Sequence, residues 1–175
     1  MIIMGLDVAT HVGVAVLAEG TIVHREVLYY PPDKRVKQNH PSRFVRWTHY
    51  ATAVEDLLTQ WAITHVFIEG YGYANKHTLV TLVELGATIR QVLHESDARW
   101  HEVPPGKLKK FVTGSGVAKK DLVLLNVYKR FGISCENDDE ADAVSLAYFG
   151  ATYLGVLLPD LPVAQLRVAQ ELDKR

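Results

Sequence analysis

The sequence predicts one α/β domain in which a mixed five-stranded sheet, three antiparallel strands followed by two parallel strands, is flanked by helices. Three short runs rich in β-branched residues follow one another at the start of the chain. Beyond them, segments with helical spacing alternate with short apolar runs, the order typical of parallel strands. The 175 residues suffice for one sizeable core. We expect residues 1–155 to form this domain and residues 156–175 a helical C-terminal tail.

The first three strands are expected in the segments IIMGLD, VGVAVLA and TIVHREVLYY, which short polar breaks separate. Such breaks suit consecutive hairpins of one sheet. A polar, proline-marked arm, PPDKRVKQNHPS, follows. Its Ser42 can cap a helix that runs to about Gln60, because apolar residues recur there at helical spacing.

The second half of the chain alternates between strand and helix patterns. Residues 65–70, HVFIEG, are a short apolar run typical of a buried strand, and residues 75–94 have a helical period. WHEVP supplies the last strand, and the two prolines that follow start a short basic helix that breaks at Gly-Ser-Gly. Two more helices are expected over residues 119–131 and about 138–154.

Composition predicts a soluble, cytoplasmic protein, in the host cytoplasm if its source is a phage. No apolar run approaches the roughly 20 residues needed to span a bilayer, and MIIMGLD lacks the pattern of a signal peptide. Cys135 is the only cysteine, so neither an internal disulfide nor a cysteine-based zinc cluster is expected.

The net charge of −1 would argue against a nucleic-acid partner, but the charge is segregated along the chain. Residues 31–50 and residues 101–120 each carry five basic residues against one acidic residue. Part of the negative charge that compensates these basic stretches lies in residues 136–142, ENDDEAD, where five of seven residues are acidic. Basic stretches of this kind suit contacts with phosphates. The candidate DNA-binding cations in them are Arg43, Lys107, Lys109, Lys119 and Lys120.

Four acidic residues are candidate catalytic and metal-binding groups. Asp7 and Glu69 each end an apolar strand, where functional sites gather in α/β proteins. Asp139 and Asp142 are three residues apart on an expected helix and therefore share a face. Asp138 competes with Asp139, because Asp138 and Asp142 also share a face, and acids at a helix start can also act as caps.

Carboxylates held close together repel one another and take up protons unless cations compensate them. An oxygen-only donor set suits Mg²⁺, with Mn²⁺ as a substitute, better than zinc. Two such ions about 4 Å apart in each active site can activate water on one side of a phosphodiester and stabilise the leaving oxygen on the other. The four acids therefore predict a metal-dependent phosphodiester hydrolase.

Four segments of the chain resemble the RuvC family of crossover junction endodeoxyribonucleases, which have a ribonuclease H-like fold. GLDVATHVGVAVL resembles the hairpin with the first catalytic acid, VFIEG the strand that ends in the second, and DEADAVSLA the helix with the last two. KKFVTGSGVAKK resembles a basic family segment, whose two lysines fall on Lys109 and Lys120. The segments occur in family order over residues 2–150. By this resemblance, the catalytic and metal-binding acids are Asp7, Glu69, Asp139 and Asp142.

The resemblance implies a structure-selective endonuclease that acts as a homodimer, holds a four-way (Holliday) DNA junction and makes paired symmetric nicks. In bacterial family members an aromatic residue three positions after the second acid wedges into the junction centre, and here that position is Gly72. Tyr71 and Tyr73 flank it and are candidates to stack on exposed bases. The helix over residues 75–94 is the first candidate for the dimer surface.

Three other functions compete with this interpretation. Another ribonuclease H-like nuclease, acting on flaps, forks or RNA–DNA hybrids, would use the same acids. An actin-like or sugar-kinase-like ATPase has a similar phosphate loop, but 175 residues leave no room for the second domain that it needs. A junction-binding scaffold without cleavage is the non-enzymatic alternative, and the presence of all four acids argues against it.

Overall fold

The computed structural model describes residues 1–30, 40–72 and 76–173, with the side chains of residues 40–42 and 76–78 left out. Within these residues, the strands are β1 (Ile2–Val8), β2 (Val12–Ala18), β3 (Thr21–Leu28), β4 (His65–Glu69) and β5 (Arg99–Val103). The helices are α1 (His40–Gln60), α2 (Lys76–Glu95), α3 (Pro105–Thr113), α4 (Lys120–Phe131), α5 (Asp138–Tyr153) and α6 (Val163–Gln170).

The strands form one sheet in the order β3-β2-β1-β4-β5. β2 pairs antiparallel with both β1 and β3, through the short hairpins that the sequence indicates. β4 pairs parallel with both β1 and β5, and a parallel pair requires a crossover connection, which α2 provides between β4 and β5. The predicted mixed sheet of three antiparallel and two parallel strands is therefore confirmed.

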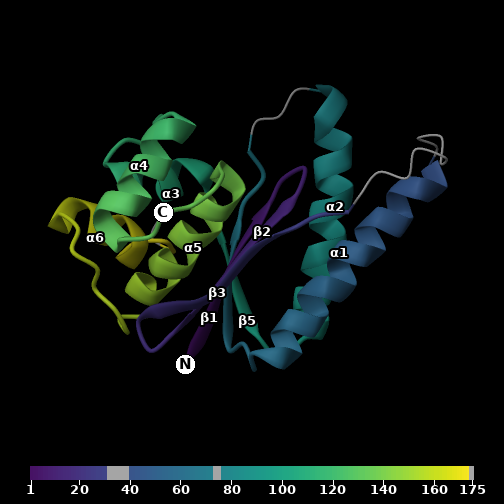
Figure 1. Ribbon diagram of the computed structural model, residues 1–175, viewed down its shortest axis with the longest axis horizontal. Coiled ribbons are helices and arrows are strands. Elements are labelled where there is room, and N and C mark those ends of the chain that lie inside the picture. Colours follow the sequence, from purple (N-terminus) through teal and green to yellow (C-terminus); the bar gives the residue numbers. More distant parts are fainter. Residues whose placement is uncertain (31–39, 73–75, 174–175) are drawn as a thin grey trace.

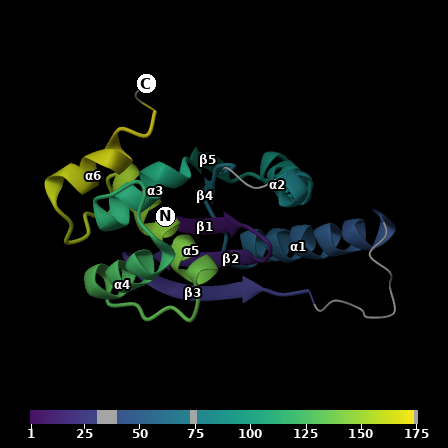
Figure 2. The same cartoon turned by 90° about the horizontal axis from the view of Figure 1, so that it is seen from above.

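Helices cover both faces of this sheet, α1 and α2 on one side and α3 to α6 on the other (Figures 1 and 2). The alternation of side chains along β1 divides the core in two. Met4 and Leu6 pack with Trp47 of α1 on one face, whereas Ile3 packs with Phe149 of α5 on the other. Among the described residues, no helix is both long enough and apolar enough to cross a membrane.

The helix boundaries follow local signals, with one exception. Pro105 opens α3, and left-handed glycines end α3 and α4 at Gly114 (φ 83°) and Gly132 (φ 70°). The prediction that Ser42 caps the first helix is wrong, because α1 already begins at His40.

The C-terminal segment packs on the rest of the chain through α6. Gln165 donates a hydrogen bond of 2.8 Å from Nε2 to the carbonyl oxygen of Phe111 in α3. Ala169 is fully buried in the core that α3, α4 and α5 share. This segment therefore shares a core with the predicted nuclease domain.

Helix α5 lies directly against the backbone of β1 and β2 at two glycines. A Cβ atom at Gly5 would lie well under 3.0 Å from the carbonyl oxygen of Ala143, and one at Gly13 equally close to that of Asp139. Gly13 is the register partner of Asp7, so both side-chain positions lie on the sheet face that α5 covers. The two glycines thus fix how closely the start of α5 approaches the end of β1.

We expect Gly5→Ala to lower the free energy of unfolding by about 3 kcal/mol, because the new methyl group meets backbone atoms of α5 that cannot rotate away. Urea titration followed by circular dichroism measures this change. Gly106→Ala is the matched control, since a Cβ there meets its nearest neighbour at 3.8 Å. Equal stability of the two variants would contradict the role given to Gly5.

Candidate active site

Four acidic side chains meet at one end of the sheet, and we call Asp7, Glu69, Asp139 and Asp142 the acidic cluster. Asp7 lies near the end of β1, and Glu69 is the last residue of β4. Because β1 and β4 are parallel neighbours, their carboxyl ends bring these two side chains within hydrogen-bonding reach. Asp139 and Asp142 lie in the first two turns of α5, which the glycine contacts hold against β1 and β2.

Burial and the neighbouring negative charges raise the pKa values of three cluster members, Asp7, Glu69 and Asp142. The pKa of Asp7 lies well above its ordinary value, first because the side chain is buried and then because of the charges of Glu69, Asp142 and Asp139. Burial and the charge of Glu69 raise the pKa of Asp142 from 3.8 to about 7. Burial also raises the pKa of Glu69. The cluster therefore favours bound protons or cations.

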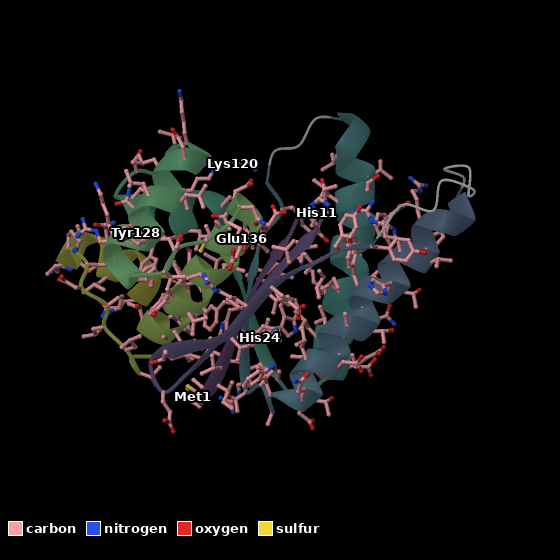
Figure 3. All side chains as sticks on the ribbon, viewed as in Figure 1. Met1, His11, His24, Lys120, Tyr128 and Glu136 are labelled. Carbon is pink, nitrogen blue, oxygen red and sulfur yellow. The ribbon has the colours of Figure 1, made fainter. Side chains whose placement is uncertain are left out.

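Two lysines oppose this accumulation of negative charge. Lys109 of α3 and Lys120 of α4 both act to lower the pKa values of Glu69 and Asp142, so both ammonium groups lie within electrostatic range of the cluster. In Figure 3, Lys120 lies at the upper end of the sheet, and Met1 lies at the opposite end. The structure thus brings together the predicted acids and the two lysines that the family resemblance singled out.

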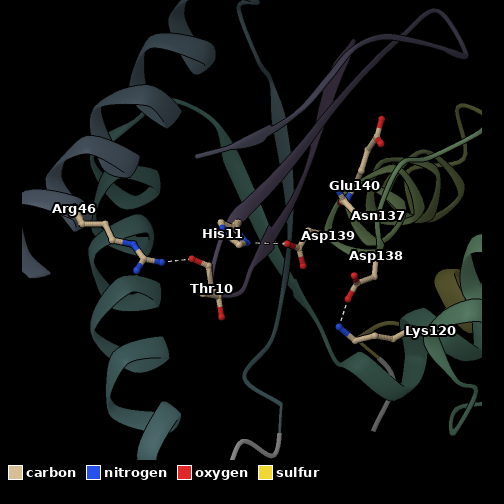
Figure 4. A network of polar contacts seen from close by, with 8 residues as sticks. All are labelled: Thr10, His11, Arg46, Lys120, Asn137, Asp138, Asp139 and Glu140. Atoms are coloured by element: carbon tan, nitrogen blue, oxygen red, sulfur yellow. Dashed lines mark hydrogen bonds and ion pairs between the residues drawn. The ribbon is translucent and has the colours of Figure 1, made fainter. Parts of the chain in front are cut away.

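The two neighbouring acids at the start of α5 have different surroundings. Asp138 is paired with Lys120 (Figure 4). The charge of Asp139 instead raises the pKa of each of the other cluster members, and its carbonyl group packs on Gly13, the register partner of Asp7. This geometry favours Asp139 over Asp138 as the fourth member of the cluster.

Neither of these acids caps α5, because Asn137 does so. The Asn137 side chain accepts a hydrogen bond of 2.9 Å from the backbone nitrogen of Glu140. The Glu140 carboxylate in turn accepts a 2.7 Å hydrogen bond from the backbone nitrogen of Glu136 and pairs with Arg25 of β3 at 3.2 Å. These contacts anchor the start of α5 while Asp139 and Asp142 remain available to the site.

One residue beside the cluster was not predicted from the sequence. His11, at the turn between β1 and β2, places Nδ1 3.5 Å from Oδ2 of Asp139. Arg46 of α1 donates a hydrogen bond to the carbonyl oxygen of Thr10, so the turn is held between α1 and α5 (Figure 4). The only sequence feature that could have indicated His11 is its position four residues after Asp7 in the same hairpin.

The other predicted DNA-binding cations lie outside this cluster. Lys107 donates hydrogen bonds of 3.1 and 2.9 Å to two backbone carbonyls just past α6, so its ammonium group holds the C-terminal segment. Lys119 is exposed and is the N-cap residue of α4, directly before Lys120. Arg43 of α1 lies 3.8 Å from Glu84 of α2.

Of the two candidate aromatic residues, Tyr71 is described and Tyr73 lies outside the described residues. Tyr71 is 47% exposed just past the end of β4. Its ring lies against Gly86 of α2, and the guanidinium carbon of Arg90 is 4.3 Å from the ring centroid. Arg90 was also missed from the sequence, where a single arginine in an amphipathic helix carries no distinguishing pattern.

The chemistry of the cluster fits a hard divalent cation. In the part of the chain that the structure describes, no group of three or more His, Cys, Asp or Glu side chains is placed so that it could hold a metal ion. The acidic cluster nevertheless offers carboxylate oxygens alone, with raised pKa values that a cation would relieve. A set of this kind can bind divalent ions beside a phosphate that the lysines attract.

The sequence is similar to those of known nucleases. A crossover junction endodeoxyribonuclease RuvC from Orientia tsutsugamushi (strain Ikeda) is 29% identical over 157 residues, which cover 85% of this chain and 93% of the relative. A second RuvC, from Prochlorococcus marinus (strain MIT 9303), is 28% identical over 108 residues, which cover 61% of this chain and 70% of that relative. The chain is similar in sequence to crossover junction endodeoxyribonucleases named RuvC. No family model matches it.

Solved RuvC structures share its fold. The RuvC structure of Thermus thermophilus matches with a TM-score of 0.70 at 22% identity, over 91% of this chain and 99% of that one. T. thermophilus RuvC in complex with a Holliday junction substrate matches with a TM-score of 0.71 at 21% identity over the same shares. The predicted ribonuclease H-like fold of RuvC is therefore confirmed.

The raised pKa of Asp142 predicts a pH-dependent stability in metal-free buffer. A carboxyl group whose pKa rises on folding contributes stability at low pH, and this contribution is lost as the pH rises through about 7. Asp142→Asn removes this loss, so at pH 8 the variant is expected to be more stable than the wild type by up to about 4 kcal/mol. Urea unfolding at pH 4.5 and pH 8 measures the difference.

The exposed Asp97, which precedes β5, provides the control, and Asp97→Asn is expected to leave the pH dependence of the stability unchanged. Added Mg²⁺ should reduce the difference in the free energy of unfolding between the wild type and Asp142→Asn at pH 8, because the ion stabilises only the intact cluster. Parallel pH profiles for all three proteins would contradict the electrostatic account of the site.

Proposed function

We propose that this chain is a metal-dependent DNA endonuclease that resolves four-way junctions by paired symmetric nicks. The observation that carries the proposal is the convergence of the acidic cluster on β1, β4 and α5, with Lys109 and Lys120 beside it. The name of its relatives, crossover junction endodeoxyribonuclease, describes this reaction, and one similar structure is of RuvC with a Holliday junction substrate.

The acidic cluster holds two Mg²⁺ ions in this proposal, and Mn²⁺ can substitute. When bound, the ions supply an activated water and stabilise the leaving oxygen. Lys109 and Lys120 attract the scissile phosphate toward the carboxylates and offset their charge. The contacts of α5 with Gly5 and Gly13 keep the carboxylates from moving apart as a DNA strand enters.

A homodimer places two such sites on one junction, as the symmetry of a four-way junction requires. Helix α2 supports this part of the proposal, because it exposes three apolar side chains on the side away from the core. Leu79 is 40%, Val80 56% and Val83 42% exposed. Contiguous apolar side chains on a surface helix commonly mark an interface.

The exposed ring of Tyr71 supports a contact with bases at the junction centre. It lies two residues after Glu69, one position before the family's wedge residue. Aromatic side chains stack on any unpaired base, each contributing about 1–3 kcal/mol. In this proposal Tyr71 takes the place of the aromatic side chain that Gly72 lacks.

We expect Asp7→Asn to reduce nicking of a synthetic four-way junction by at least about 100-fold while binding is retained, because a charged ligand is lost at the reacting centre. Labelled four-way, flapped, forked, linear and RNA–DNA hybrid substrates are compared in parallel with Mg²⁺. Asp97→Asn is the control variant and should cleave normally. Nicking by Asp7→Asn would remove Asp7 from the site, and equal cutting of linear duplex would refute junction resolution.

Val80→Glu is expected to weaken the dimer about 30-fold or more, since it places a charge in the proposed apolar interface. Sedimentation velocity over a concentration series measures the dissociation constant. Val156→Glu alters a side chain of similar exposure, 50%, just beyond α5, and should leave association unchanged. A wild-type protein that sediments as a monomer at every concentration would exclude the dimer.

A further inference from the structure

Arg90 of α2 joins several parts of the structure beside the acidic cluster. Its Nε donates a hydrogen bond of 2.5 Å to Glu102 of β5. One terminal nitrogen donates to the carbonyl oxygen of Gly86 at 3.1 Å, and the other to the carbonyl oxygen of Glu69 at 3.2 Å. Its guanidinium carbon also lies 4.3 Å from the ring centroid of Tyr71. A side chain only 13% exposed thus contacts β5, the end of β4 and its own helix.

Gly86 completes the support for the Tyr71 ring. A Cβ atom at this position would lie 2.7 Å from Cε1 and 2.8 Å from the hydroxyl oxygen of Tyr71, so only glycine lets the ring lie against α2. The ring is held by the Gly86 backbone and by Arg90, yet remains 47% exposed. A ring already fixed in place loses little conformational entropy when a base stacks on it.

We infer that Arg90 is a positioning residue that couples two parts of the proposed reaction, the stacking of Tyr71 on an unpaired base and the placement of Glu69 in the acidic cluster. The inference rests on the proposed function and deepens it. Both residues lie at the end of β4, two positions apart, and Arg90 binds the backbone of one and the ring of the other. A base that engages Tyr71 therefore acts on the same guanidinium that fixes the Glu69 carbonyl group.

An ion pair alone does not account for these contacts. Glu102 is 45% exposed, and an ion pair with an exposed partner contributes little to stability. The planar guanidinium can donate to Glu102, Gly86 and Glu69 while its face lies near the ring, which a lysine ammonium cannot do. Arg90→Lys therefore keeps the charge but removes the coupling.

The test uses full-length protein and a four-way junction with 2-aminopurine at its centre, at temperatures well below unfolding. Binding is measured first, in buffer with Ca²⁺ in place of Mg²⁺. The wild-type protein is expected to change the 2-aminopurine fluorescence because Tyr71 stacks on the base, and with Arg90→Lys this change should be smaller by at least about half. In Mg²⁺, Arg90→Lys should raise the half-saturating Mg²⁺ concentration about tenfold and lower the single-turnover rate about tenfold. Arg99→Lys, at the exposed far end of β5, is the matched control and should match the wild type.

Two further variants separate the two arms of the coupling. Tyr71→Ala should lose the fluorescence change and shift the Mg²⁺ dependence less than Arg90→Lys does, because Arg90 still donates to the Glu69 carbonyl oxygen. Glu102→Gln should shift both readouts in the direction of Arg90→Lys by a smaller amount. A lower melting temperature of Arg90→Lys with unchanged fluorescence and Mg²⁺ dependence would overturn the inference and leave junction cleavage intact. A wild-type protein that cleaves no junction would overturn both proposals.

Discussion

The position of α5 on the sheet is the contact on which the rest of the site depends. Two acids of the cluster come from strands and two from this helix, so their separation is set by how far the helix axis lies from β1 and β2. Gly5 and Gly13 remove the side chains that would otherwise separate the two layers. Asn137 and the Glu140–Arg25 ion pair then fix where the helix begins. The geometry of the acidic cluster thus depends on residues that are not members of it.

The burial of the acidic cluster, which the proposed function requires, lowers the stability of the fold. Burial raises the pKa values of Asp7, Glu69 and Asp142, so the folded chain holds groups that would be better solvated if it were unfolded. Lys109 and Lys120 offset only part of this cost. The apolar cores on both sheet faces supply the stability that lets the acids remain together.

Periodicity along the sequence was sufficient to predict the strands, the helices and the order in which the sheet mixes antiparallel and parallel pairs. Asp7 and Glu69 could be predicted as site residues because each ends an apolar run, and Asp142 because it shares a helix face with Asp139. Long-range contacts were not accessible in this way. Lys107 resembles its neighbour Lys109 in sequence, yet it binds carbonyl groups 64 and 65 residues further along the chain. The roles of Asn137, His11 and Arg90 likewise depend on partners in other elements.

The bonds from Lys107 to the segment beyond α6 have a practical consequence for handling the protein. Lys107 lies one turn or less from Lys109 on α3, so Glu171 and Leu172 share one support with the basic side of the site. Met1 is 60% exposed at the opposite end of the sheet (Figure 3). An affinity tag or a fluorophore is therefore best attached at the N-terminus, where neither its bulk nor its charge reaches α3.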